Sequence, residues 1–274
     1  MAIGAVVVGG DAPLALLAGP CAIEDEPHAL RTAETLLRMT SDAGVPLVYK
    51  SSYDKANRSS ARSYRGPGLR EGLRILARVK AAFGCPVLSD VHLPSEVDAA
   101  AEVLDLLQIP AFLCRQTDLV LACGRSGRPV SVKKGQFMAP WDMENVVDKL
   151  RSVGCEDVLL TERGASFGYN NLVVDMRAFP ILRSLGFPVV YDVTHSLQLP
   201  GAGEGVTAGQ AEFIEPMASA GVAAGVDGVF MEVHDNPKEA KSDGANALDS
   251  RKLRGVLKEL LAVQKGLAKV HATP

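Results

Sequence analysis

Short apolar runs alternate with longer segments of helical periodicity along nearly the whole chain. Most of these runs lack the polar alternation of a half-exposed strand, which is typical of parallel strands buried on both faces. The pattern predicts eight such strands, at residues 14–19, 46–51, 86–91, 105–108, 129–133, 157–162, 188–192 and 228–233.

Helical patterns occupy most of the gaps between these runs. Apolar residues recur at helical spacing within residues 27–43, 70–83, 94–103, 145–153, 176–185, 209–224 and 248–267. Glycine follows many of the segments, as at Gly44 and Gly84, and this is the usual signal for the C-terminus of a helix. Eight strands with intervening helices favour the α/β class, and within it a closed (β/α)8 TIM barrel over an open doubly wound sheet.

We expect residues 1–274 to form a single catalytic domain built on this barrel. The stretch at residues 5–13 carries three consecutive valines and then Gly-Gly-Asp ahead of the first predicted strand. It predicts a short N-terminal hairpin that plugs the bottom of the barrel.

The composition narrows the class of function. The chain is 47% hydrophobic, and its 29 Lys and Arg against 32 Asp and Glu give a formal net charge of −3. Neither a disordered chain nor a nucleic-acid-binding protein has this balance. We also expect no membrane partner, because the apolar run at residues 2–8 is far shorter than a span of about 20 residues. The five cysteines form no CxxC pair, which is typical of reduced cytoplasmic thiols.

Chemistry in barrels of this kind gathers at the carboxyl ends of the strands. Polar or reactive residues stand at or just after these ends: Cys21, Lys50, Ser52, Asp90, His92, Gln108, Lys133, Lys134, Glu162, Arg163, Asp192, His195, Glu232 and His234. Polar residues begin loops in any barrel, but a structural role alone does not require so many ionisable groups at one mouth. We therefore place the candidate site there.

One group of residues at these strand ends and in the loops that follow them is cationic. Its members are Lys50, Lys55, Arg58, Lys133 and Arg163. Clustered cations repel one another unless an anion lies between them, and phosphates and carboxylates are the natural ligands. Each cation taken alone can equally be a solvated loop charge. Of the neighbours Lys133 and Lys134, only one can point into the barrel mouth.

A second group combines Cys21, His195 and Glu232 from strand ends with Asp243 from a later loop. Thiolate, imidazole and carboxylate ligands suit a divalent ion of the Zn, Fe, Mn or Co class. The spacing is not that of a compact metal-binding motif, so a buried cysteine and a strand-end histidine without a metal are an equal alternative. The glycine-rich stretch at residues 196–208, after the seventh strand, is either a mobile lid or a simple connection.

Several of these residues stand in longer motifs. The most specific is Lys50-Ser-Ser-Tyr-Asp-Lys-Ala-Asn-Arg-Ser-Ser60, followed by Arg65-Gly-Pro-Gly68. Supporting motifs are Ser89-Asp-Val-His92, Gln108-Ile-Pro-Ala111, Val132-Lys-Lys-Gly-Gln136, Asp192-Val-Thr-His195 and Glu232-Val-His with Ser242-Asp243. From about residue 14 to residue 246, the chain resembles the 3-deoxy-D-manno-octulosonate 8-phosphate synthases, also called 2-dehydro-3-deoxyphosphooctonate aldolases.

The resemblance implies a transferase that condenses phosphoenolpyruvate with D-arabinose 5-phosphate and water, and releases inorganic phosphate in the synthesis of a lipopolysaccharide precursor. By match, the residues for phosphoenolpyruvate would be Lys50, Ser52, Lys55, Gln108, Ala111, Lys133 and Arg163, and Gln136 is a further substrate-binding candidate. Those for arabinose 5-phosphate would be Asn57, Arg58, Ser59 and Asp90. We expect the catalytic groups among Lys55, Asp90, Lys133 and His195, and which of them is acid or base stays open.

The resemblance also bears on the metal. Metal-independent members of the family carry Asn where this chain has Cys21, so the set of Cys21, His195, Glu232 and Asp243 implies the metal-dependent class. A homotetramer and a cytoplasmic location are implied in the same way. One alternative is a heptulosonate 7-phosphate synthase, although those enzymes carry Lys-Pro-Arg-Thr where this chain has Lys-Ala-Asn-Arg. The other is a barrel that binds sugar phosphates without catalysis.

Overall fold

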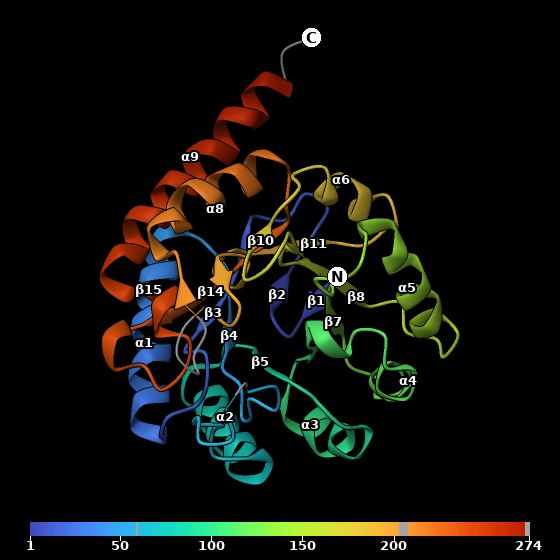
Figure 1. Cartoon of the computed structure of the whole chain (residues 1–274). Helices are drawn as coiled ribbons and strands as arrows, with labels where there is room; N and C mark the ends of the chain where they lie inside the picture. The colour runs from blue at the N-terminus through green and yellow to red at the C-terminus, as the bar shows by residue number, and fades with distance from the viewer. Residues whose placement is uncertain (59, 203–207, 272–274) are drawn as a thin grey trace.

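The structure, a computed structural model, describes residues 1–58, 60–202 and 208–271. Within these ranges eight parallel strands form a closed barrel, because β14 pairs with β3 on one side and with β11 on the other (Figure 1). In order around the ring they are β3 (Ala15–Gly19), β4 (Leu47–Lys50), β5 (Val87–Asp90), β6 (Leu106–Ile109), β7 (Val130–Lys133), β8 (Val158–Glu162), β11 (Val189–Asp192) and β14 (Gly228–His234). The predicted TIM barrel is confirmed.

Helices surround this ring on the outside, and the last one continues well beyond the barrel (Figure 1). The α-helices are α1 (Glu26–Ala43), α2 (Leu69–Phe83), α3 (Val97–Val103), α4 (Thr117–Arg125), α5 (Glu144–Arg151), α6 (Ala178–Arg183), α7 (Val193–Ser196), α8 (Ile214–Ala223) and α9 (Leu253–His271). Short 3-10 helices are η1 (Pro94–Glu96), η2 (Ala111–Leu113), η3 (Pro140–Met143), η4 (Ala211–Phe213), η5 (Pro237–Glu239), η6 (Gly244–Asn246) and η7 (Ser250–Lys252). Across the described ranges, none of these helices combines the length and the apolar character needed to cross a bilayer.

Local signals explain where helix α1 begins and ends. The side chain of Asp25 accepts a hydrogen bond from the backbone N–H of His28, and Pro27 lies in the first turn. Gly44 ends the helix in the left-handed conformation, with φ of +68°. The chain then passes directly into β4, which is the short helix-to-strand connection expected of a (β/α)8 barrel.

Helix α4 was not predicted from the sequence. It is only nine residues long, and Gly124 near its end weakens the helical signal by about 1 kcal/mol relative to alanine. The glycine has a packing reason, because a Cβ atom there would lie 2.7 Å from Cγ2 of Val153. Helix α4 therefore depends on its packing against the end of α5, because helix propensity alone does not predict it.

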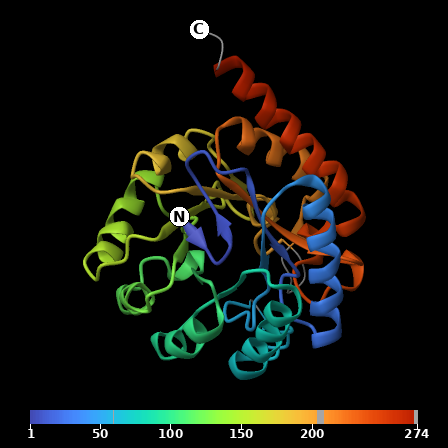
Figure 2. The same cartoon turned by 180° about the vertical axis from the view of Figure 1, so that it is seen from behind.

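The N-terminal hairpin exists, but the predicted range of residues 5–13 was wrong. Strands β1 (Ala2–Ile3) and β2 (Val6–Val7) pair antiparallel around a turn in which Gly4 has φ of +55°. A Cβ on Gly4 would lie 3.0 Å from Pro86, which precedes β5, so the hairpin sits at the amino ends of the strands (Figure 2). Ile3 packs with Leu17 and Phe230 in the apolar interior of the barrel. The plug therefore seals the end opposite to the candidate site.

The remaining short strands lie in the loops. They are β9 (Ala165–Ser166), β10 (Leu172–Val173), β12 (Gln198–Leu199), β13 (Ala208–Gly209) and β15 (Leu248–Asp249). Strands β12 and β13 pair antiparallel and so join the two ends of the glycine-rich stretch at residues 196–208. Residues 203–207, which include Gly203 and Gly205, lie outside the described residues, and the choice between a lid and a simple connection stays a prediction.

Candidate active site

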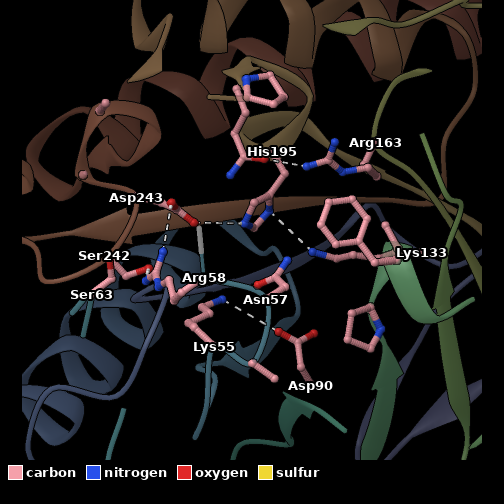
Figure 3. Close-up of a pocket in the computed structure, with 18 of the residues that line it drawn as sticks. Lys55, Asn57, Arg58, Ser63, Asp90, Lys133, Arg163, His195, Ser242 and Asp243 are labelled. Atoms are coloured by element: carbon pink, nitrogen blue, oxygen red, sulfur yellow. Dashed lines mark hydrogen bonds and ion pairs between the residues drawn. The ribbon is translucent and has the colours of Figure 1, made fainter. Parts of the chain in front are cut away.

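A cavity of about 610 Å³ opens at the carboxyl ends of the barrel strands (Figure 3). Eleven of the residues singled out in the sequence line it: Lys55, Asn57, Arg58, Asp90, His92, Ala111, Lys133, Gln136, Arg163, His195 and Asp243. Five others lie buried around it and do not line it: Cys21, Lys50, Ser52, Gln108 and Glu232. Ser59 lies outside the described residues. The predicted convergence on one mouth is therefore observed for all but one of these residues.

The cavity floor contains a buried ion pair between two strand ends. The Lys50 ammonium donates to Glu232 Oε1 at 2.6 Å and to the carbonyl of Cys21 at 3.0 Å, and both ionised side chains are fully buried. Strands β3 and β4 approach closely here, since a Cβ on Gly19 would lie 1.9 Å from the Lys50 carbonyl oxygen. The Lys50 charge is thus held beneath the cavity and is paired within the protein.

Asp90 is the centre of a hydrogen-bond network at the ends of β5 and β6. Its carboxylate accepts from Ser52 Oγ at 2.7 Å and from Gln108 Nε2 at 2.7 Å, and Lys55 Nζ lies 3.7 Å away. Burial acts to raise the pKa of Asp90, but the ammonium groups of Lys55, Lys50 and Lys133 hold it well below its usual range. The carboxylate is therefore a hydrogen-bond acceptor at neutral pH.

Lys133, Asp192 and His195 form a second network. Lys133 Nζ lies 2.6 Å from Asp192 Oδ2 and 4.0 Å from the centroid of the Phe230 ring. His195 Nδ1 lies 2.8 Å from Asp192 Oδ2, and Figure 3 shows the ring between Lys133 and Asp243. Burial lowers the pKa of His195, so the neutral imidazole is favoured. A neutral ring that donates from Nδ1 to Asp192 presents the lone pair of Nε2.

The neighbour Lys134 points away from the cavity. Its ammonium donates to the carbonyls of Gly135 at 3.2 Å and Met138 at 3.1 Å, and lies 3.5 Å from Glu162 Oε1. The expectation that only one lysine of this pair faces the mouth is confirmed, and the one that faces it is Lys133.

Cys21, His195 and Asp243 bring ligand atoms within 4.8 Å of one another. Cys21 Sγ lies 3.1 Å from Asp243 Oδ2, and His195 Nε2 lies 3.3 Å from Glu232 Oε1. Burial raises the pKa of the Cys21 thiol to about 12, and Asp243 and Glu232 act in the same direction, so a thiolate needs a cation beside it. Glu232 Oε2 has no hydrogen-bond partner among the described residues. This donor set fits a divalent metal ion.

Two arginines enter the cavity from opposite sides. Arg58 lies 3.6 Å from Asp243 Oδ1 and also contacts Ser242 Oγ, and its Nε donates to the Tyr64 carbonyl. Arg163 donates from Nη2 to Gln198 at 2.6 Å, whereas its buried Nη1 has no partner within the described part of the chain. Burial lowers the pKa of Arg163, but the ordinary pKa of an arginine is so high that the guanidinium stays charged. An anion in the cavity would satisfy this unpaired donor.

Comparison with known proteins assigns the family. The model of the DAHP synthetase I family matches residues 2–268. The 2-dehydro-3-deoxyphosphooctonate aldolase of Geobacter sulfurreducens is 59% identical over 261 residues, which cover 95% of this chain and 96% of the relative. The aldolase of the same name from Geotalea uraniireducens is 57% identical over 263 residues, covering 96% and 97%. The chain belongs to this aldolase family. The resemblance seen in the motifs is thereby confirmed.

Two residues of the site, Asp192 and Ser242, appeared in the sequence analysis only within strand ends or motifs and were given no role there. Asp192 stands at the end of β11 and three residues before His195, and that spacing on a strand end is the signal that could have identified it. Ser242 contacts Cys21 Sγ at 2.8 Å and precedes Asp243, whose backbone is left-handed with φ of +49°. The sequence does not predict this left-handed conformation, because non-glycine residues rarely adopt it.

Proposed function

We propose that this chain condenses phosphoenolpyruvate with D-arabinose 5-phosphate and water, giving 3-deoxy-D-manno-octulosonate 8-phosphate and inorganic phosphate. The observation that carries the proposal is the convergence of Lys55, Lys133, Arg58 and Arg163 on one cavity, in a chain 57–59% identical to named 2-dehydro-3-deoxyphosphooctonate aldolases. Both substrates are phosphorylated anions, and buried cations without anionic ligands would be costly.

Phosphoenolpyruvate would occupy the side of the cavity between Lys133 and Arg163. The unpartnered Nη1 of Arg163 is a donor for its phosphate or carboxylate, and Lys133 adds a second positive charge. Ala111 and Gln136 line the same cavity, whereas Gln108 and Ser52 act from beneath by fixing Asp90. Lys50 would not contact substrate, and its role would be to hold Glu232.

Arabinose 5-phosphate would lie toward Asn57 and Arg58. The Arg58 guanidinium is held between Asp243 and Ser242, and its planar donors suit a phosphate oxygen pair. The sugar aldehyde would then face the middle of the cavity, where Lys55 and Asp90 stand beside His195. This arrangement would place the aldehyde carbon next to the enol carbon that attacks it.

The chain's own groups supply the proton transfers and the charge stabilisation. As the new carbon–carbon bond forms, negative charge develops on the aldehyde oxygen, and the Lys55 ammonium can stabilise it or donate a proton. Lys55 suits this task because burial acts to lower its pKa but Cys21, Asp90 and Glu232 raise it, so the group stays protonated. Lys133 and Arg163 would stabilise the phosphate as the C–O bond breaks. Asp90 is the candidate for accepting a proton from the attacking water, because Asp192 and the metal would engage both ring nitrogens of His195.

A divalent metal of the Zn, Fe, Mn or Co class would be held by Cys21, His195, Glu232 and Asp243. Bound there, it would supply Lewis-acid polarisation and orientation of the aldehyde. Its support is the donor set and the orphaned Glu232 Oε2. A homotetramer in the cytoplasm remains the expectation drawn from the family resemblance.

The acceptor sugar tests this function against its nearest alternative. We expect kcat/KM with arabinose 5-phosphate to exceed that with erythrose 4-phosphate by at least about a hundredfold, since the site's donors must match the longer sugar. Mass spectrometry of the product identifies the eight-carbon acid. Higher turnover with erythrose 4-phosphate would assign the heptulosonate 7-phosphate synthase activity. No turnover with either sugar would favour a barrel that binds sugar phosphates without catalysis.

A further inference from the structure

A second group of metal-ligand side chains lies at the end of β14 and shares no residue with the cluster around Cys21. One ring nitrogen from each of His28 and His234 and a carboxylate oxygen of Glu24 lie within 4.8 Å of one another. The two imidazole rings have centroids 4.7 Å apart. Both histidines are buried, and the Glu24 side chain is 14% exposed. Two imidazoles and a carboxylate form a donor set that transition-metal dications prefer.

Asp235 orients both rings. Its Oδ1 lies 3.1 Å from His28 Nε2 and 3.1 Å from His234 Nδ1. When these two nitrogens carry the ring protons, the other nitrogen of each ring presents a lone pair, as in carboxylate–histidine–metal arrangements. In the structure the backbone N–H of Asn236 donates to His234 Nδ1 at 2.9 Å and to Asp235 Oδ1 at 3.1 Å, so without a cation the His234 ring carries its proton on Nε2. A cation at Nε2 moves that proton to Nδ1, and the Asn236 N–H then donates to Asp235 alone.

The two remaining nitrogens suit a cation. His234 Nε2 lies 3.2 Å from Glu24 Oε1, close to the separation of about 3.3 Å between neighbouring ligands of a tetrahedral zinc ion. His28 is 5% exposed, and its Nδ1 has no hydrogen-bond partner within the described ranges. A buried acceptor without a partner is unfavourable in the protein alone, and a bound cation would satisfy it.

We propose that Glu24, His28 and His234 form a second, structural site for a divalent transition-metal cation such as Zn²⁺, with water as the fourth ligand. The Asp235 side chain is 56% exposed, so the site borders solvent and a cation can reach it. Glu24 Oε1 also accepts the backbone N–H of Lys241 at 2.9 Å, so the cation fixes the segment that leads to Asp243. The site does not depend on which substrates the cavity takes.

Cobalt(II) titration of the metal-free protein tests this site, because the two clusters have different spectra. A cobalt ion bound by Cys21 shows a sulfur-to-metal charge-transfer band, and one bound by nitrogen and oxygen alone does not. We expect two equivalents per chain, of which one gives the band. His28→Gln weakens the other equivalent by at least about tenfold and keeps the band. Cys21→Ser removes the band and keeps the other equivalent.

Further variants separate loss of the site from loss of the fold. Glu24→Gln keeps an acceptor for Lys241 and is expected to lose the same equivalent as His28→Gln, with an unchanged circular dichroism spectrum. Glu239→Gln removes an exposed carboxylate of η5 that belongs to neither cluster, and it is expected to bind two equivalents. The proposal is overturned if the wild type binds only the band-forming equivalent, or if His28→Gln and Glu24→Gln both bind two. A single equivalent without the band, lost in His28→Gln, would support this site and contradict the one at Cys21.

Discussion

His195 Nδ1 lies 2.8 Å from Asp192 Oδ2, and this contact turns His195 Nε2 toward Glu232 and Asp243. Such a carboxylate fixes the tautomer and the orientation of a ligating imidazole. We predict that Asp192→Asn weakens metal binding by about 10- to 100-fold, measured by competition with a chelator of known affinity. The exposed Asp175→Asn is the control and should bind metal like the wild type. Equal metal affinity in both variants would show that Asp192 does not orient His195 for metal binding.

The adjacent lysines of β7 and its loop should respond in opposite ways. We predict that Lys133→Met lowers kcat/KM by at least about a hundredfold, because a positive charge facing the substrate is lost. Lys134→Met should instead lower the free energy of unfolding by about 3–5 kcal/mol, because it leaves the buried Glu162 without its ammonium partner. Steady-state kinetics and denaturant unfolding on both variants measure the contrast. Full activity in Lys133→Met would contradict its assignment.

Metal removal should abolish the reaction. The thiol of Cys21 has a pKa raised by burial to about 12, so its role as a ligand depends on a cation that stabilises the thiolate. We predict that exhaustive chelation reduces kcat by at least about a hundredfold, and that adding a divalent transition metal restores it. Cys21→Ala should match the chelated enzyme and should not recover on metal addition. Activity that survives chelation would place the chain in the metal-independent class.

Acid should destabilise the protein partly through Glu96. Burial acts to raise the pKa of Glu96, but hydrogen bonds from His92 and Tyr53 lower it to about 2, from an ordinary value of 4.5. A carboxyl group with a depressed folded-state pKa contributes stability that is complete above about pH 5 and is lost as the pH falls toward 2.

We therefore predict that the wild type loses about 2 kcal/mol more of its unfolding free energy than Glu96→Gln between pH 6 and pH 2. Denaturant unfolding at a series of pH values measures this difference. Glu102→Gln, at an exposed position of α3, is the control and should follow the wild type. Parallel pH curves for the wild type and Glu96→Gln would show that these hydrogen bonds do not set the pKa of Glu96.

The barrel could be predicted because its signal is physical and repeated. Strands buried on both faces need uninterrupted apolar runs, and all eight runs became barrel strands within one or two residues of their predicted ends. Helix α4 was not predicted from the sequence, and the N-terminal hairpin was predicted at the wrong residues. Both depend on close contacts, of Gly124 with Val153 and of Gly4 with Pro86, which local sequence does not contain.

The site was predictable as a set of residues and not as a set of contacts. The strand-end rule brought Lys133 and His195 to one mouth, but the sequence could not show that Asp192 lies between them. Nor could it show that Lys50 is held by Glu232 and so lies beneath the cavity. The pairings of Lys133 with Asp192 and of Lys50 with Glu232 join residues far apart in the chain, and only the closed barrel determines them.

Phosphate release tests the central claim most directly. The metal-loaded protein is given phosphoenolpyruvate with arabinose 5-phosphate, and inorganic phosphate is measured together with the eight-carbon product. We predict one phosphate for each molecule of 3-deoxy-D-manno-octulosonate 8-phosphate, and none with phosphoenolpyruvate alone. No phosphate above that background, from a folded protein with metal bound, would contradict the proposed function.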